Sequence, residues 1–421
     1  MILAAWARIR RRSLSNDAAD AILQAWRQRQ TTPPATWAQL LAHLQASAAQ
    51  VDTVPLGRAV HALAKLGYAT PDLLDHLSGR SLYLPPVSSS FLVDLADTFG
   101  RAGRFDRDLF RTVSLRLATP NALVGRLSSC RASTLLHACA RVGFADPHLF
   151  AAVSRDVLAN VDIMPVTFMS RLVWSLARTR MAACSDPSRD LARSVLARLL
   201  AIDLSENRSG GSSTTIVTDI MWAYGVIADV IDRRPQARQL VAVLARYLEP
   251  RLERTSPHSL ASGLWAAATL QTDLPGDLLQ AAADHATHQI ATCRSNSCIA
   301  ILAWSVAKLR VLHDPLFAAV AALPSQRWTQ FRPGDLNMAA WALSQQNDCR
   351  YNDALLAIAQ AALQQLDRYR PAELCALLCT LSQLRHRTPL FDDAVRRLGR
   401  DLDKLDANQR AMLLSALLDD R

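Results

Sequence analysis

Residues 337–344 read NMAAWALS, and similar eight-residue phrases occur earlier in the chain. They are RLVWSLAR at 171–178, DIMWAYGV at 219–226, SGLWAAAT at 262–269 and ILAWSVAK at 301–308. With Trp341 as position zero, the pattern extends to nine copies, whose zero positions are His61, Asp97, His137, Trp174, Trp222, Trp265, Trp304, Trp341 and Cys379. Successive copies lie 36 to 48 residues apart, and most lie near 38. This period is typical of one helical hairpin in an α-solenoid.

Each copy has the residue pattern of an amphipathic helix. Positions −5, −2, −1, zero and +2 are mostly apolar, and we assign them to one buried face. Position +3 is small in every copy: Ala64, Gly100, Ala140, Ala177, Gly225, Ala268, Ala307, Ser344 and Ser382. We therefore expect the next hairpin to approach closely at position +3, with the aromatic residue at position zero packed beside that contact.

A second helix follows each phrase after a turn that contains Pro or Asp. Examples are TPDLLDHL at 70–77, DPHLFAAV at 146–153, DPLFAAVA at 314–321 and TPLFDDAV at 388–395. Asp or Thr before Pro provides an N-cap followed by Pro at the first helical position. No strand-like alternation of useful length occurs. The sequence predicts an all-α fold, a right-handed α-solenoid of hairpin repeats with a period near 38 residues.

Composition divides the chain into four segments. Residues 1–16 hold four arginines and no acidic residue, which indicates an organellar targeting segment or, as the alternative, a basic N-terminal helix. Residues 203–215 are polar and rich in Gly and Ser, and we expect a flexible loop there. This loop separates a basic repeat arm, 17–202, from a near-neutral arm, 216–421, that ends in a capping hairpin. No apolar run reaches the roughly 18–20 residues that span a bilayer, so we expect no membrane partner.

The positive charge is concentrated in the first half and consists almost entirely of arginine. Of the 47 cationic residues only three are lysine, and residues 1–210 hold 25 Lys and Arg against 16 Asp and Glu. Residues 211–421 hold 22 against 21. Because arginine binds phosphate with two parallel hydrogen bonds and stacks on bases, this distribution indicates a basic patch for nucleic acid.

Cations recur at fixed positions of the repeat. Position +4 carries a cation in the first four copies and again in the seventh, and position −3, nearly on the same helix side, carries Arg in two copies. With one further turn arginine, these form our predicted RNA-binding site: Arg58, Lys65, Arg101, Arg104, Arg141, Arg171, Arg178 and Lys308. A line of cations can follow a phosphate backbone. The alternative is that cations in the last helical turn stabilise the helix dipole. Further arginines in the same region favour the RNA interpretation: Arg107, Arg111, Arg116, Arg126 and Arg131.

No pattern for catalysis, metal or cofactor binding stands out. The phosphate loop and the common hydrolase and metalloprotease motifs are absent, and the chain has only four glutamates. The eight cysteines show neither disulfide nor zinc spacing, and we interpret Cys375 and Cys379 as buried apolar residues. His285 and His288 are assigned to a solvated helix face. We expect no enzyme activity, no cofactor and no metal.

Three segments resemble a known repeat family. They are AVHALAKLGYATPDLLDHL at 59–77, LLHACARVGFADPHLFAAV at 135–153 and ILAWSVAKLRVLHDPLFAAV at 301–320. These resemble the octotricopeptide and heptatricopeptide repeats, and the related repeats of FAST-kinase-like proteins, over roughly residues 50–400. The resemblance implies an organellar RNA-binding protein that serves transcript stability, processing, translation or ribosome assembly. Members often end in a RAP domain, which this sequence does not show, and this favours a binder or ribosome-associated scaffold over a nuclease.

Together these observations predict a mitochondrial, alternatively chloroplast, RNA-binding helical-repeat protein. We expect its basic arm to hold rRNA or other single-stranded or irregular RNA, as a ribosome component or as an RNA stability or assembly factor. The near-neutral arm is expected to dock neighbouring proteins of a ribonucleoprotein assembly. The alternative is a protein–protein scaffold solenoid without direct RNA contact, whose basic patch meets an acidic partner.

Overall fold

The computed structural model describes most of the chain as helices. The described residues are 16–30, 32–81, 87–118, 127–202, 213–346, 349–382, 389–398, 405–407 and 409–411. Every regular element among them is an α-helix or a short 3-10 helix, which confirms the all-α helical-repeat architecture. Residues 1–15 of the expected targeting segment, 203–212 of the expected loop and most of the expected capping hairpin lie outside these ranges.

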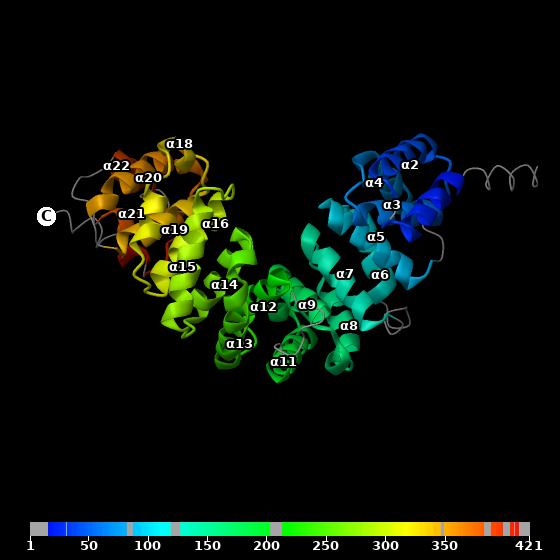
Figure 1. The fold of residues 1–421 in the computed structure, drawn as a ribbon, viewed down its shortest axis with the longest axis horizontal. Helices are drawn as coiled ribbons and strands as arrows, with labels where there is room; N and C mark the ends of the chain where they lie inside the picture. The colour runs from blue at the N-terminus through cyan, green and yellow to red at the C-terminus, as the bar shows by residue number, and fades with distance from the viewer. Residues whose placement is uncertain are drawn as a thin grey trace, which may run out of the picture. The chain divides into compact units, whose positions relative to one another are not determined.

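The chain folds into two compact units, which are treated separately. Unit 1 comprises Met1–Ile202 and Ile227–Arg233, and unit 2 comprises Asp203–Val226 and Arg234–Arg421. Within each unit, successive hairpins lie beside one another (Figure 1).

Unit 1 begins with a helix at 16–27 and α2 (Pro34–Ser47), followed by four hairpins. Their first helices pack on one another in sequence order: α3 (Thr53–Lys65), α5 (Ser89–Ala102), α7 (Ser129–Val142) and α9 (Val166–Thr179). Their second helices also pack on one another in sequence order and form a second layer: α4 (Pro71–Ser81), α6 (Arg107–Ala118), α8 (Pro147–Leu158) and α11 (Asp186–Ala201). The short η2 (Val161–Ile163) precedes α9 and α10 (Met181–Cys184) follows it. Each hairpin thus covers the face that the previous one leaves open.

Unit 2 repeats this arrangement. Its first helices are α12 (Thr214–Ile227), α14 (Pro257–Leu270), α16 (Asn296–Lys308), α19 (Pro333–Ser344) and α21 (Pro371–Leu381). Its second helices are α13 (Arg234–Leu248), α15 (Gly276–Ile290), α17 (Asp314–Ala321), α20 (Asn352–Gln364) and α22 (Pro389–Leu398). The shorter elements are η4 (Glu249–Arg254), α18 (Ser325–Trp328), η5 (Cys349–Tyr351) and η6 (Leu366–Arg368).

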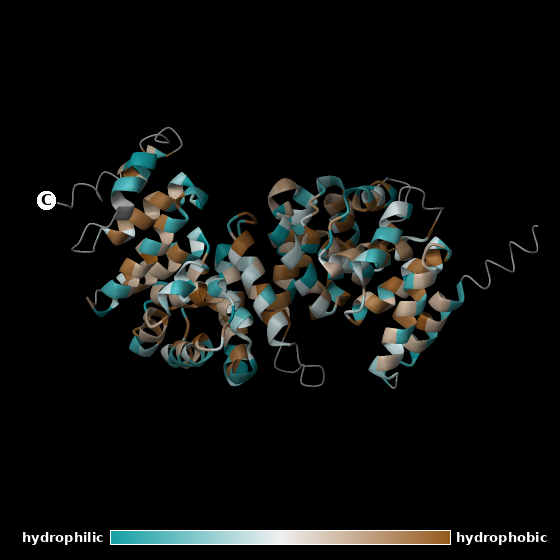
Figure 2. Cartoon of the chain, turned by 90° about the horizontal axis from the view of Figure 1, so that it is seen from above, coloured by the Kyte–Doolittle hydropathy of each residue, from teal (hydrophilic) through white to brown (hydrophobic). Residues whose placement is uncertain are grey.

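The core of both units lies between the two helix layers and between neighbouring hairpins. In α19 the residues at positions −5, −2, −1 and +2 are at most 1% exposed: Leu336, Ala339, Ala340 and Leu343. The same four positions are buried in every copy of the first helix. Hydrophobic residues accordingly run along helices throughout both units (Figure 2). Burial of this repeated face is what ties each hairpin to its neighbours.

The small residue at position +3 is a close contact between hairpins, as the sequence predicts. A Cβ atom added at Gly100 in α5 would lie 2.9 Å from Cα of Ala138 in α7. In unit 2, one added at Gly225 would lie 3.1 Å from Cα of Ala266 in α14. Ala138 and Ala266 both occupy position +1 of the next repeat, and this position is also small in every copy. The first helices therefore touch through paired small residues.

Position zero agrees with the expectation in one respect and differs in another. An added Cβ at Gly225 would lie 3.0 Å from Cζ3 of Trp265, so this tryptophan packs beside the close contact, as expected, but the tryptophans are not part of the fully buried face. Trp222, Trp265, Trp304 and Trp341 in unit 2, and Trp174 in unit 1, are only half-buried. Among the polar residues at this position, His61 and Asp97 are buried, at 8% and 5% exposure, and His137 is half-buried. The tryptophans thus lie on the open side of the first helices instead of filling the core.

Two of the predicted helix starts can be compared with the structure: α8 confirms its predicted Asp cap, and α17 shifts its cap by one residue. Asp146 accepts hydrogen bonds from the backbone amides of α8, and Ser256 does so for α14. At α17 the expected cap, Asp314, is the first helical residue instead. His313 takes the cap position, and its Nδ1 accepts from the Leu316 amide at 3.1 Å. An imidazole acceptor can replace a carboxylate at a helix N-terminus because the requirement is for a nearby lone pair.

Candidate nucleic-acid interface

The cations predicted at position +4 lie in the last turns of four consecutively packed helices of unit 1. Lys65 ends α3, Arg101 lies near the end of α5, and Arg141 and Arg178 lie near the ends of α7 and α9. Because each helix packs on the next, the four side chains follow one another along one edge of the layer. Lys65, Arg141 and Arg178 are exposed, and Arg101 is half-buried. We call these four residues the basic edge.

Contacts within the protein engage two residues of the basic edge. Arg101 Nε donates to Asp97 Oδ2 at 2.7 Å, one turn earlier on the same helix. Arg141 Nη2 donates to the Arg101 carbonyl at 3.4 Å, so it also contacts the C-terminal end of α5. This second contact is what the helix-dipole alternative expects. Arg178 makes no hydrogen bond or ion pair with another described residue.

Lys65 lies beside both aromatic and charged groups. Its Nζ is 5.7 Å from the centre of the Trp26 ring. Burial lowers the pKa of Lys65, and the nearby Asp94 and Asp97 carboxylates oppose this shift. The lysine therefore combines a cation–π contact with its place on the basic edge.

The remaining predicted residues are distributed less evenly. Arg58 is exposed on α3, and Arg171 lies with its guanidinium 5.3 Å from the Phe168 ring. Arg104 follows α5 in a turn, where it pairs with Asp75 and donates to the Pro71 carbonyl at 3.0 Å. Lys308 belongs to unit 2. The structure thus brings together the four basic-edge residues, which share position +4 of the repeat. Arg104 instead contacts the start of α4.

A charge network lies beside the basic edge. His61 Nε2 is 3.3 Å from Asp94 Oδ1, and its Nδ1 is 3.1 Å from the hydroxyl of Thr98. Arg131 pairs with the same Asp94 carboxylate. Burial lowers the pKa of His61 to about 4, although Asp94 opposes this, so the ring is neutral at neutral pH. This face of unit 1 therefore carries carboxylates among its cations.

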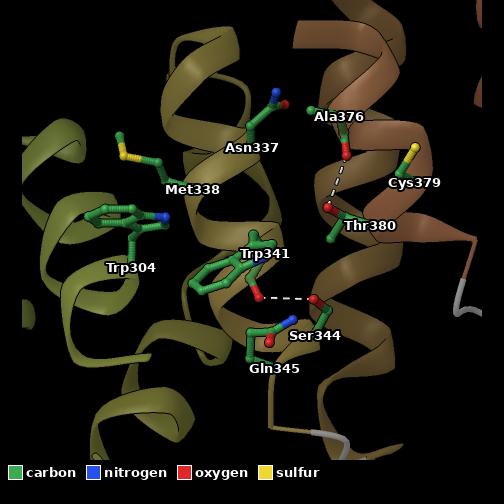
Figure 3. A pocket seen from close by; sticks show the side chains of 9 residues that line it. All are labelled: Trp304, Asn337, Met338, Trp341, Ser344, Gln345, Ala376, Cys379 and Thr380. Carbon is green, nitrogen blue, oxygen red and sulfur yellow. Dashed lines mark hydrogen bonds between the residues drawn. The ribbon is translucent and has the colours of Figure 1, made fainter. Parts of the chain in front are cut away.

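The half-exposed tryptophans of unit 2 form a second feature, which sequence reasoning assigned to the core. The ring centres of Trp304 and Trp341 are 6.2 Å apart and their planes are inclined by 46° (Figure 3). They line a hollow of about 370 Å³ together with Asn337, Met338, Ser344, Gln345, Ala376, Cys379 and Thr380. The signal available in the sequence was the angular position of tryptophan, which lies on the other side of the helix from the apolar positions −5, −2, −1 and +2.

A second hollow, of about 570 Å³, adjoins the first. It is lined by Gln271, Thr272, Asp273, Ala307, Lys308, Leu309, Arg310, Trp341 and Gln345. Trp341 and Gln345 belong to both hollows. The volumes fall in the range of ordinary ligand pockets.

Other chemistry finds little support in the described part of the chain. It holds no group of three His, Cys, Asp or Glu side chains that could bind a metal ion. None of the eight cysteines, all of which are described, forms a disulfide; Cys375 is buried, as expected, whereas Cys379 is half-buried. None of the described helices is both long enough and apolar enough to cross a membrane.

Comparison with known proteins adds little beyond the fold. No protein-family model matches the sequence. No curated protein matches it either. Among solved structures, the chain is similar to one in a "homology model of the full-length AP-3 complex in an intermediate open conformation", with 12% identity and a TM-score of 0.30. The match covers 95% of this chain and 83% of that chain, and at this score it carries no argument about function.

The fold and these surfaces together define a class. The chain is an all-α helical-repeat protein whose repeats place the same helix positions side by side. Such arrays typically bind extended partners along repeated positions.

Proposed function

We propose that this chain is a non-catalytic RNA-binding helical-repeat protein and that its basic edge contacts the phosphate backbone. The observation that supports this most is the register of Lys65, Arg101, Arg141 and Arg178. They place one cation per repeat at the ends of four helices that pack in sequence. Packed helix axes lie about 8–10 Å apart, so these cations recur at a regular spacing, as an extended polyanion requires.

The contacts within the protein do not prevent this role. Arg101 is partly exposed, but its partner Asp97 is buried, so exchanging Asp97 for a phosphate would leave a buried carboxylate without its partner. We therefore assign Arg101 a smaller share in RNA binding than the exposed Lys65, Arg141 and Arg178. Arg141 keeps further guanidinium donors beside the one that contacts the Arg101 carbonyl. Arg104 is held by Asp75 and Pro71, and we assign it a smaller share in RNA binding.

The resemblance to octotricopeptide and heptatricopeptide repeats supports the cellular setting of the proposal. On this basis the protein acts in the mitochondrion, or alternatively in the chloroplast. Its RNA would be rRNA or another single-stranded or irregular transcript, and its role that of a ribosome component or of a stability or assembly factor. Neighbouring proteins of the same ribonucleoprotein assembly would dock on unit 2.

The competing proposal is a protein scaffold whose basic edge binds an acidic protein. It is favoured by one observation, the pairing of Asp94 and Asp97 with Arg131 and Arg101, which shows that this surface already accommodates carboxylates. Salt dependence of RNA affinity separates the two proposals, because each phosphate contact to single-stranded RNA contributes about 0.7 to the slope of log K against log salt.

The test compares two triple variants of the full chain. Lys65, Arg141 and Arg178 are changed to Gln in the first, and Arg155, Arg246 and Arg396, exposed on the second helices α8, α13 and α22, are changed to Gln in the control. Both variants lose the same charge. Fluorescence anisotropy with a 20-nucleotide unstructured RNA should show the slope reduced by about 2 in the first variant and nearly unchanged in the control. Equal slopes in wild type and the first variant would reject the basic edge as the RNA contact.

A further inference from the structure

Trp341 lies where the two hollows of unit 2 meet. One hollow extends from Trp304 across Trp341 towards Cys379, and the other extends from Gln271 across Lys308 to Trp341. The lining residues come from α16, α19 and α21 on one side of the indole, and from the ends of α14 and α16 on the other. Two chemically different compartments therefore share one aromatic wall.

The first compartment suits a flat aromatic group. Trp304 and Trp341 are half-buried, line the hollow and are inclined to each other, so their rings form two walls of a corner and are not stacked face to face (Figure 3). Met338 lies on the same side and adds a polarisable thioether to the lining. Indole faces left open to solvent bind the π-faces of nucleobases without regard to base identity.

The first compartment also offers hydrogen-bonding groups at its edge. Asn337 Nδ2 donates to the Glu373 carbonyl at 2.7 Å, whereas its buried Oδ1 has no hydrogen-bond partner among the described residues. Such an atom is costly unless a donor reaches it. The exposed Gln345 makes no side-chain hydrogen bond within the described part of the chain. Because both amide atoms of Asn337 are buried or engaged, the exposed Gln345 is the side chain that can pair with the amino and carbonyl groups on the edge of a base.

The second compartment carries positive charge. Lys308 Nζ lies 5.6 Å from the centre of the Trp341 ring, and Arg310 lies two residues further along the chain. Asp273 is the single acidic residue in the lining, so the compartment has a net charge of about +1. A phosphate attached to a base on Trp341 would find its counter-charges here.

We propose that one base of a single-stranded RNA stacks on Trp341 with Trp304 against its edge, and that its phosphate is held by Lys308 and Arg310. This inference rests on the proposed function only in taking RNA as the ligand. It uses residues of unit 2 alone, none of which belongs to the basic edge. It also changes the expectation for unit 2 from a surface for protein docking to one that takes part in RNA binding.

The test separates base stacking from phosphate binding. The full chain is titrated with a 12-nucleotide unstructured RNA and with an abasic ribose-phosphate oligomer of the same length. Trp341→Leu should bind the RNA about tenfold more weakly, which corresponds to the loss of one base stack, and should bind the abasic oligomer as wild type does. Trp341→Phe keeps a ring and should retain most of the affinity. Tyr247→Leu, at a half-buried aromatic residue of the second helix α13, is the matched control and should bind both oligomers normally.

Wherever wild type binds RNA, the results separate the stacking inference from the proposal for the basic edge. Equal affinity of wild type for RNA and the abasic oligomer, with no effect of Trp341→Leu, would overturn the stacking inference and leave the basic edge intact. An acidic peptide that competes with RNA only in wild type, and not in Trp341→Leu, would identify the corner as a peptide site and overturn the inference as well. Failure of wild type to bind either oligomer would overturn both proposals. Thermal melts of all variants establish that they are folded.

Discussion

The close contact between hairpins makes a quantitative prediction at Gly100. In α5 this glycine faces Ala138 of α7, and an added Cβ would lie 2.9 Å from Cα and 3.0 Å from Cβ of that alanine. Carbon atoms in ordinary contact are about 3.5–4.0 Å apart, so Gly100→Ala must separate the two helices by about 0.5–1 Å. Both near atoms belong to the backbone or to Cβ and cannot move by rotation of a side chain.

Two opposing effects set the size of the change. Replacing Gly by Ala inside a helix favours the helix by about 0.5–1 kcal/mol. Overpacking of a close contact costs about 1–3 kcal/mol. Gly79 in α4 isolates the first effect, because no atom lies within 4 Å of its added Cβ. Gly79→Ala should therefore stabilise unit 1, and Gly100→Ala should be less stable than Gly79→Ala by about 1–3 kcal/mol.

The assay is thermal unfolding of the full chain, followed by circular dichroism or calorimetry. For a unit of this size 1 kcal/mol corresponds to about 2–4 °C in Tm, so the two variants should differ by about 2–12 °C in the transition of unit 1. If Gly100→Ala raised Tm as much as Gly79→Ala, the first helices would not approach as closely as the structure shows, and the reasoning about paired small residues would be refuted.

Three further predictions concern burial, pH and hydrogen bonding. Trp328 in α18 is fully buried, so Trp328→Ala should lower the free energy of unfolding by about 3–5 kcal/mol. Trp304 is only half-buried, so Trp304→Ala should lower it by less than half as much. Urea denaturation measures both losses, and equal losses would contradict the difference in burial. Burial raises the pKa of Asp219 to about 6, so the folded state holds the proton more tightly than the unfolded state, and stability should fall as pH rises from about 4 to 6. Asp219→Asn should remove this fall in Tm, and an unchanged pH profile would contradict it. Arg80 Nη2 donates hydrogen bonds to the carbonyls of Ala48 and Ala49 at 3.0 and 2.9 Å. Because a lysine ammonium lacks the planar arrangement of guanidinium donors, Arg80→Lys should lower the free energy of unfolding of unit 1 by about 1–2 kcal/mol. A Tm equal to that of wild type would count against this prediction.

The repeat architecture could be predicted because its physical signals are local and recur. The apolar positions −5, −2, −1 and +2 follow helical periodicity within each copy, and the Pro- and Asp-containing turns mark where each second helix begins. The small residue at +3 predicted a close contact, which Gly100 and Gly225 show. Its partner at position +1 was not identified, since pairing across repeats depends on the offset between neighbouring helices.

The position of the tryptophans could have been derived but was assigned wrongly. At about 100° per residue, positions +2, −2, −5 and −1 fall between about 160° and 260° around the helix, with position zero at 0°. Position zero therefore lies on the other side of the helix from these four positions, although His61 and Asp97 are buried there in unit 1. Hydrophobicity was taken to mean burial, although Trp304 and Trp341 remain half-exposed.

The charge network could not have been read from sequence spacing. Arg131 on α7 reaches Asp94 on α5, 37 residues earlier, and His61 on α3 reaches the same carboxylate. Side-chain rotamers and the offset between neighbouring helices differ from repeat to repeat, and they determine which cations form ion pairs within the protein. For that reason Arg101 and Arg178 share a register, yet only Arg101 has a carboxylate within reach.

The most direct test of the account is photocrosslinking of the full chain to an RNA that carries 4-thiouridine at every second position, followed by identification of the linked peptides. The account predicts links within residues 58–67, 97–104, 137–143 and 171–180, near the ends of the first helices of unit 1, and a further set around Trp304 and Trp341. Links confined to the second helices, for example to α6 and α8, would contradict the claim that the repeats bind RNA along the ends of their first helices.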